Sequence, residues 1–217
     1  MNRVWRHLTF TSSYNRSVIP AVVLAAGLST RMGGSPKALL PLADGRTFAD
    51  AIIDTFLDAG IGEIVVVVGH ESARVQEHLA RSRPQARTIV NPDYQSGQFS
   101  SLLTGLDAID RPGVAGMLMT LVDVPGVSPT TVRAVVDRFR ETAAPIVRPV
   151  LGHEHGHPVL IARALFGVLR HANPAEGAKP VVRAHVSAAG DVLVHDDLAF
   201  RDVDTPAAHE ALLRGDR

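Results

Sequence analysis

Short runs of β-branched and other apolar residues alternate along this chain with segments whose apolar residues recur at helical spacing. This alternation is typical of βαβ units that build a mostly parallel sheet, so it constrains the fold strongly. We therefore expect an α/β protein in which helices fill the gaps between strands. The predicted strands lie at residues 19–25, 63–68, 87–90, 116–122, 144–150, 157–161 and 192–195.

Three helix signals support this pattern. An apolar face at residues 47–59, followed by Gly60, predicts a helix that stops at the glycine. Ser128 with Pro129 predicts an N-cap and a first-turn proline, and Thr205 with Pro206 repeats that signal for the last helix. Residues 151–158, where glycines and histidines gather, resemble an insertion between two strands.

The length of 217 residues, without a linker or repeat, favours one domain over residues 18–217. Residues 1–17 are expected to be an N-terminal extension. They contain three arginines and no acidic residue, so a transit peptide is the alternative.

Composition excludes several classes of function. The formal net charge is zero, which disfavours a broad basic surface for nucleic acid. The chain has no cysteine, which excludes disulfides and thiolate chemistry and fits a reducing, cytoplasmic setting. The longest apolar run, residues 64–68, is far shorter than the roughly 20 residues that a membrane-spanning helix needs, so no membrane partner is expected.

A glycine-rich loop at residues 24–37 follows the first predicted strand and carries two cations, Arg31 and Lys37. Backbone N–H groups in such a loop can form a concavity for phosphate, and open α/β sheets bind ligands at this edge. The alternative is a surface turn with two solvated cations. The loop contains neither the Gly-x-Gly-x-x-Gly nor the Gly-Lys-Ser/Thr pattern, which disfavours dinucleotide-binding and Walker A sites.

Two groups of carboxylates follow later strands. Asp123 comes directly after a strand, at the same sheet edge as the loop, which is a natural position for Mg²⁺. The alternative is that Asp123 caps a turn before Pro125. Asp202 and Asp204 alternate along an extended segment and are expected on one side, although Thr205 and its proline explain the helix start without any function.

A third segment, residues 91–106, places hydroxyls at the start of a helix. Ser100 and Ser101, with Gly97, suit either an N-cap or a bound base and phosphate. Tyr94 and Phe99 could stack on a ring, although the core is the better place for Phe99.

Three histidines, His153, His155 and His157, alternate within the segment that resembles an insertion. On an extended chain their rings would share one face, so a transition-metal site is one interpretation. The sequence offers no obvious fourth ligand for it.

Taken in order over residues 19–213, these motifs resemble the MobA-like nucleotidyltransferase family. The first loop is similar to the family's LAAGxSxRMGxxK sequence, with one extra residue before Lys37. The resemblance implies a three-layer α/β/α Rossmann-like nucleotidyltransferase fold. It also implies catalytic roles for Arg31 and Lys37, which would stabilise charge passing to pyrophosphate. The remaining loop residues that would hold the triphosphate are Leu24, Ala25, Ala26, Gly27 and Ser29.

The later motifs carry further implied roles. The family's metal-binding aspartates correspond to Asp123, which would also be catalytic, and to Asp204, with Mg²⁺ as the cofactor. Gly97, Ser100 and Ser101 match a G-x-x-S-S segment that contacts the nucleotide. The final motif departs from the family at residues 207–208, which are alanines here. The acceptor would lie beside a Gly-His-Pro turn formed by His157 and Pro158.

The implied reaction is transfer of a nucleoside monophosphate from its triphosphate to a phosphate of molybdopterin, with release of pyrophosphate. Leu-Ala-Ala-Gly, with Ala26, is similar to cytidylyltransferases, whereas guanylyltransferases usually have Leu-Ala-Gly-Gly; CTP is therefore the expected donor. A recipient molybdoenzyme or its chaperone would be a further partner. The alternatives are guanylyl transfer, another phosphorylated acceptor, and a non-catalytic module that binds a cofactor.

Overall fold

The computed structural model describes residues 17–32 and 34–215, apart from the side chain of Arg31. The expected extension at residues 1–17 therefore lies outside the described residues except for its last position, and it stays a prediction.

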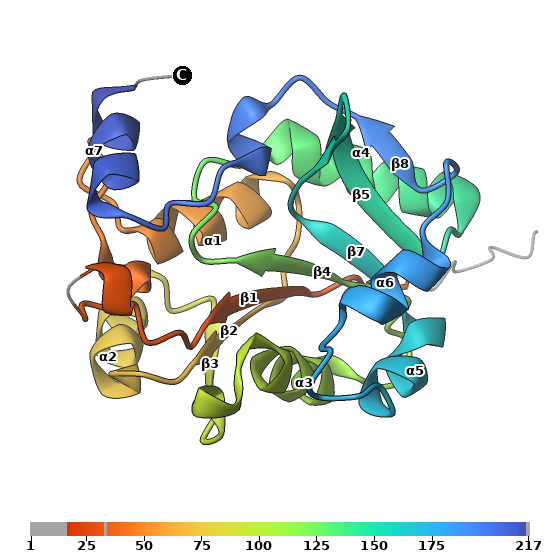
Figure 1. The fold of residues 1–217 in the computed structure, drawn as a ribbon, viewed down its shortest axis with the longest axis horizontal. Helices are drawn as coiled ribbons and strands as arrows, with labels where there is room; N and C mark the ends of the chain where they lie inside the picture. The colour runs from red at the N-terminus through yellow and green to blue at the C-terminus, as the bar shows by residue number, and fades with distance from the viewer. Residues whose placement is uncertain (1–16, 33, 216–217) are drawn as a thin grey trace, which may run out of the picture.

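An eight-stranded mixed sheet runs through the middle of the molecule (Figure 1). Its strand order is β3-β2-β1-β4-β7-β5-β6, and β8 pairs with β5 in parallel. The β3-β2-β1-β4 portion is parallel throughout, whereas β7 runs antiparallel to both β4 and β5. The strands are β1 (Ala21–Ala25), β2 (Ile64–Val68), β3 (Arg87–Val90), β4 (Gly116–Leu121), β5 (Ile146–Leu151), β6 (Glu154–His155), β7 (Val159–Ala162) and β8 (Asp191–Leu193).

Helices cover both faces of the sheet and enclose two hydrophobic cores (Figure 1). One core lies against α1 (Phe48–Asp58), α2 (Ser72–Ser82), α4 (Pro129–Thr142) and α7 (Pro206–Arg214). The other lies against α3 (Gln98–Ile109), α5 (Phe166–Arg170) and α6 (Lys179–His185). The expected three-layer α/β/α architecture is therefore confirmed.

The central strands form from continuous apolar runs because both of their faces are covered. All five residues of β1 and of β2 are buried, as expected for parallel strands between two helical layers. Alternate residues of β1 belong to opposite cores: Val23 packs toward α1 and Val22 packs toward α3. This burial fixes the carboxyl end of β1, where the glycine-rich loop begins.

Side-chain caps start α1, α4 and α7, the last two at the residues that the sequence predicts. The Thr47 hydroxyl accepts from the Asp50 N–H of α1 at 3.2 Å, and Asp50 accepts from the Thr47 N–H at 3.0 Å. Ser128 caps α4 and Thr205 caps α7 without such a return contact, each hydroxyl accepting from a backbone N–H at 3.2 Å. These caps satisfy N–H groups that lack a partner inside the helix.

Residues 151–158 do not form a separate insertion. They contain a hairpin in which β6 pairs antiparallel with the end of β5, with Val150 opposite His155 and Leu151 opposite Glu154. Gly152 turns the chain between them at a φ of +61°, a conformation that glycine adopts at little cost. The segment thus extends the sheet.

Short 3-10 helices complete the connections. They are η1 (Thr30–Met32), η2 (Lys37–Leu39), η3 (Tyr94–Ser96), η4 (Arg163–Leu165) and η5 (Asp197–Phe200). Within the described part of the chain, no helix is both long and apolar enough to cross a membrane.

Candidate active site

A cleft of about 560 Å³ opens at the carboxyl ends of β1 and β4. These strands are neighbours, and the sheet continues in opposite directions from them, which is where open α/β sheets bind ligands. Four segments line the cleft: the loop after β1, the start of α3, the end of β4 and the segment before α7. The predicted site residues on its wall are Leu24, Ala25, Ala26, Gly27, Ser29, Lys37, Gly97, Ser101, Asp123 and Asp204.

Lys37 joins the loop to both predicted metal-binding carboxylates. Its Nζ donates to Asp123 Oδ2 at 2.9 Å and also forms an ion pair with Asp204. The Lys37 backbone N–H donates to the Ser29 hydroxyl at 3.1 Å, which closes the loop. Asp123 and Asp204, which follow Lys37 by 86 and 167 positions in the sequence, therefore meet at its ammonium group.

The environment of Lys37 keeps its ammonium charged. Partial burial would lower the pKa of Lys37, but hydrogen bonds to Asp204 and Asp123, together with their negative charges, raise it above its usual value. A cation is thus held at the floor of the cleft, where a polyphosphate would need positive charge.

The donor set suits a divalent metal. Asp123 Oδ1 is buried and has no hydrogen-bond partner, while the other oxygen of the same carboxylate contacts Lys37. With Asp204 beside it, the cleft offers the one or two carboxylates that Mg²⁺ takes when phosphate oxygens supply further ligands. No group of three or more His, Cys, Asp or Glu side chains among the described residues could enclose a metal by itself.

Asp202 and Asp204 both line the cleft, as their alternation predicts, with Val203 buried between them. Burial and the nearby charge of Asp123 raise the pKa of Asp202, and His157 and Lys37 act in the opposite direction. The Val203 N–H donates to the Asp123 carbonyl at 2.7 Å, so this segment is fixed to the end of β4.

The start of α3 forms the opposite wall. Tyr94, Gln95 and Gln98 line the cleft alongside the predicted Gly97 and Ser101. Gln95 and Gln98 were not predicted, although Gln98 stands within the G-x-x-S-S segment and Gln95 two residues before it. Their amides can donate and accept hydrogen bonds.

Ser100 and Phe99 lie away from the cleft wall. Ser100 accepts from Asn91 Nδ2 at 2.9 Å and donates to the backbone carbonyls of Asp93 and Gly97. The N-cap of α3 is Gly97, without a side-chain cap, so the N-cap interpretation of this hydroxyl is wrong. Phe99 is buried in the core beneath α3, as expected. A nucleotide contact by Ser100 stays a prediction.

Among the described residues, His153, His155 and His157 do not form a group that could hold a metal ion. His153 and His155 are exposed, whereas His157 is half-buried and its Nδ1 atom is buried without a hydrogen-bond partner. Burial lowers the pKa of His157, although a backbone hydrogen bond at Met119 opposes the change. His157 and Pro158 do not line the cleft, and their acceptor role stays a prediction. Among the described residues nothing supports the three-histidine metal site.

The backbone of Arg31 lies in η1, but its side chain is outside the described part of the structure. Its predicted contact with the triphosphate is therefore not tested by the geometry.

Comparison with known protein families matches residues 21–189 to the MobA-like NTP transferase domain. This chain belongs to that family. The resemblance drawn from the loop and aspartate motifs is therefore confirmed, and the chain is a MobA-like nucleotidyltransferase. Enzymes of this kind typically depend on a divalent metal.

Two curated relatives differ in what their names describe. Nicotine blue oxidoreductase of Paenarthrobacter nicotinovorans is 34% identical over 194 residues, covering 86% of this chain and 92% of that protein. A probable molybdenum cofactor guanylyltransferase of Rhodopirellula baltica is 34% identical over 126 residues, covering 58% of each. Some relatives are longer: this MobA-like chain spans 39% of the bifunctional protein GlmU of Cutibacterium acnes.

Among solved structures, Rv0371c of Mycobacterium tuberculosis is similar over 92% of this chain and 99% of its own, with a TM-score of 0.75 and 28% identity. A second structure of Rv0371c is a complex with manganese, with a TM-score of 0.72 and 30% identity over 91% of this chain and 98% of that one.

Proposed function

We propose that this MobA-like protein transfers CMP from CTP to a phosphate of a molybdopterin-type acceptor and releases pyrophosphate. The observation that carries the proposal is the meeting of Lys37, Asp123 and Asp204 at the floor of a cleft that the glycine-rich loop encloses. Cations and carboxylates in that arrangement provide what phosphoryl chemistry requires, which is positioning and charge stabilisation.

In this reaction an oxygen of the acceptor phosphate attacks the α-phosphorus of CTP. A new P–O bond forms, the bond from the α-phosphorus to the bridging oxygen breaks, and pyrophosphate takes the electron pair. The loop N–H groups hold the triphosphate, while Lys37 and Arg31 stabilise charge on the departing pyrophosphate. The acceptor phosphate is already ionised near neutral pH, so no side chain has to remove a proton.

Asp123 and Asp204 would hold Mg²⁺ in this scheme. A divalent ion there supplies Lewis-acid stabilisation of the phosphate oxygens and orients them for displacement. The buried, unpartnered Oδ1 of Asp123 supports this role, because a buried carboxylate oxygen without a partner is costly unless a ligand satisfies it.

The preference for CTP rests on Ala26, which is buried and lines the cleft. Its methyl group narrows the space in which a base would lie, and this favours the smaller pyrimidine ring. The Gln95 and Gln98 amides on the opposite wall could form hydrogen bonds with the edge of the base.

The test is pyrophosphate release from CTP and from GTP, each with Mg²⁺ and with or without molybdopterin. We expect release that requires the acceptor and that is faster with CTP. Absence of release from either triphosphate would contradict the proposal and favour a module that binds a cofactor without turnover. Faster release from GTP would favour guanylyl transfer.

Guanylyl transfer to molybdopterin is a second candidate because of the 34% identity with the probable guanylyltransferase of Rhodopirellula baltica. Calorimetry with CTP and GTP in the presence of Mg²⁺ separates the two candidates. Tighter binding of GTP would reverse their order.

An oxidoreductase activity is a third candidate, since the Paenarthrobacter relative matches over nearly its full length. Reduction of an organic dye by a nicotinamide nucleotide, followed by absorbance, tests it. Turnover of the dye without pyrophosphate release from any triphosphate would favour this candidate over nucleotidyl transfer.

A further inference from the structure

The ammonium of Lys37 stands where the two proposed metal ligands meet. Lys37 Nζ is 2.9 Å from Asp123 Oδ2 and is also paired with Asp204. These carboxylates come from β4 and from the segment before α7, and Lys37 lies between them. Its side chain is only 13% exposed, so the ion pair is held within the cleft floor.

The Lys37 ammonium and a divalent metal ion cannot both occupy this position. The free Oδ1 of Asp123 and the carboxylate of Asp204 would place a divalent ion directly beside the ammonium, which contacts the other oxygen of Asp123 and pairs with Asp204. The two positive charges would repel each other at short range. Engaged by Lys37, the carboxylates are therefore poor metal ligands.

Lys37 can leave without unfolding the loop. Its backbone N–H is fixed to the Ser29 hydroxyl at 3.1 Å, while the ammonium is carried on a flexible four-carbon side chain. The glycine-rich loop that precedes it lines the same cleft. A triphosphate bound by that loop would offer the ammonium a more highly charged partner within reach of this side chain.

We propose that Lys37 competes with the metal for Asp123 and Asp204. The donor nucleotide must first bind the Lys37 ammonium and move it away from these carboxylates before they bind a divalent ion tightly. Metal alone then binds weakly, and nucleotide and metal bind with positive coupling. By linkage, the metal strengthens nucleotide binding by the same factor. This inference rests on the proposed metal ligands but not on the identity of the base or the acceptor.

The test measures Mn²⁺ binding to the full chain without nucleotide, by the electron paramagnetic resonance signal of free Mn²⁺. Lys37→Met removes the competing ammonium at nearly constant side-chain length, and Lys37→Gln keeps a polar group. If the ion pair is formed in at least about nine-tenths of molecules, each variant should bind Mn²⁺ at least about tenfold more tightly than the wild type.

Lys179→Met is the matched control. Lys179 is the other lysine of the chain, is exposed at the start of α6 and does not line the cleft. This substitution changes the net charge equally, so its Mn²⁺ affinity should stay close to that of the wild type. An equal gain in Lys179→Met would mean that net charge alone is responsible and would overturn the proposal.

Thermal unfolding provides a second readout, because a ligand that binds the folded state raises the melting temperature according to its affinity. Mn²⁺ should raise the melting temperature of Lys37→Met more than that of the wild type, even if the variant starts from a lower value. Unchanged or weaker Mn²⁺ binding in both Lys37 variants would overturn the inference.

The two proposals fail separately. Pyrophosphate release by the wild type with no gain of Mn²⁺ affinity in the variants would leave the proposed function intact and reject the competition. A gain of affinity in the variants with no pyrophosphate release by the wild type would do the reverse.

Discussion

At the scale of single residues, three aspartates line one cleft, and their contacts distinguish their roles. Asp123 and Asp204 contact the ammonium of Lys37. Asp202 is an exposed residue, although partial burial of its carboxyl group in the cleft, together with the charge of Asp123, raises its pKa. The geometry therefore favours Asp123 and Asp204 as the pair that would hold a metal.

Asp204→Asn and Asp202→Asn form a matched pair for testing this choice. We expect Asp204→Asn to slow pyrophosphate release by about a hundredfold, since a neutral amide is a poor metal ligand and transition-state charge would lose stabilisation. Asp202→Asn should slow it by less than about tenfold. Steady-state rates over a range of Mg²⁺ concentrations provide the measurement, and a larger loss in Asp202→Asn would move the metal to that residue.

Ala26→Gly tests the basis of base preference. Removing the methyl group widens the cleft at this position, so the ratio of kcat/KM for CTP to that for GTP should fall, by about tenfold for a change of roughly 1.4 kcal/mol. Ala38→Gly is the control because Ala38, directly after the same loop, is buried in the core and does not line the cleft. An equal change in both variants would show that loop flexibility, rather than the methyl group, sets the ratio.

Strand-end reasoning predicted where Asp123 and Lys37 lie, because the carboxyl ends of adjacent parallel strands share one edge. It could not predict the ion pairs of Lys37, which depend on side-chain geometry between segments distant in sequence. Gln95 and Gln98 were missed for a related reason: an amide without a characteristic spacing gives no signal until the fold shows which way it faces.

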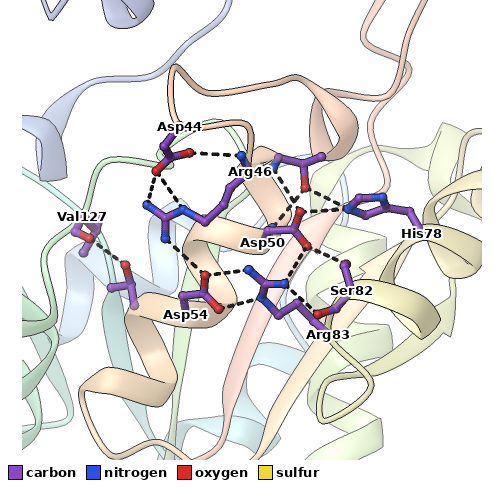
Figure 2. A network of polar contacts seen from close by, with 10 residues as sticks. Asp44, Arg46, Asp50, Asp54, His78, Ser82, Arg83 and Val127 are labelled. Atoms are coloured by element: carbon purple, nitrogen blue, oxygen red, sulfur yellow. Dashed lines mark hydrogen bonds and ion pairs between the residues drawn. The ribbon is translucent and has the colours of Figure 1, made fainter.

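At the element scale, α1 and α2 are joined by a network of polar contacts (Figure 2). Asp50 of α1 accepts from the Ser82 hydroxyl at 2.7 Å and from His78 at 2.9 Å. Arg83 pairs with Asp54 through Nε at 2.6 Å. The network fixes two helices that cover the same face of the sheet.

The network predicts a loss of stability in acid. Burial alone would raise the pKa of Asp50, but hydrogen bonds from Ser82, Thr47 and His78 lower it to about 2. A carboxylate whose pKa is lower in the folded than in the unfolded state stabilises the protein at pH values above its unfolded-state pKa. That contribution is lost as the pH falls through the folded-state pKa. The free energy of unfolding should therefore drop by about 2 kcal/mol between pH 5 and pH 2 through this group.

Asp50→Asn tests that contribution by urea unfolding at several pH values. The variant should be less stable at pH 7 and should show a shallower acid dependence than the wild type. Asp44→Asn is the control, because Asp44 forms an exposed pair with Arg46 and should leave most of the acid dependence in place. An unchanged slope in Asp50→Asn would contradict the prediction.

Gly105 sets how closely α3 approaches the sheet. A Cβ at this position would lie 2.4 Å from Cγ1 of Val22 and 3.1 Å from Cγ2 of Val67, in a packed core. Gly105→Ala should therefore reduce the free energy of unfolding by about 1–3 kcal/mol despite the better helix propensity of alanine.

Gly167→Ala on α5 is the matched control, since its Cβ would meet nothing within 4 Å. It should leave stability unchanged or raise it by up to about 1 kcal/mol, from helix propensity alone. The midpoints of urea unfolding compare the two variants. Equal stability of Gly105→Ala and the wild type would mean that α3 shifts outward without cost.

The sequence predicted the positions of most strands but not their directions. Apolar runs predict that a strand forms and is buried, whereas the antiparallel orientation of β7 depends on a short connection from β5 through β6. The two residues of β6 are too few for any periodicity to indicate. The starts of α4 and α7 were predictable because Ser128 and Thr205 cap locally.

At the scale of the whole molecule, the sheet separates two cores, and the cleft lies where the strand order turns outward from β1 and β4. The parallel half supplies Lys37, Asp123 and the glycine-rich loop. The segment before α7 crosses back to this edge and delivers Asp204 (Figure 1). The general architecture was predictable from the sequence because it depends on periodicity and burial.

The backbone hydrogen bond from Val203 to Asp123 ties a late segment of the chain to the end of a central strand. If that hydrogen bond opened while both cores stayed packed, the protein would keep its helices and strands yet lose Asp204, one of the two proposed metal ligands, from the cleft. Binding of a divalent ion is consequently a more sensitive gauge of this corner of the molecule than circular dichroism. An inactive preparation that looks fully folded is the state such an opening would produce.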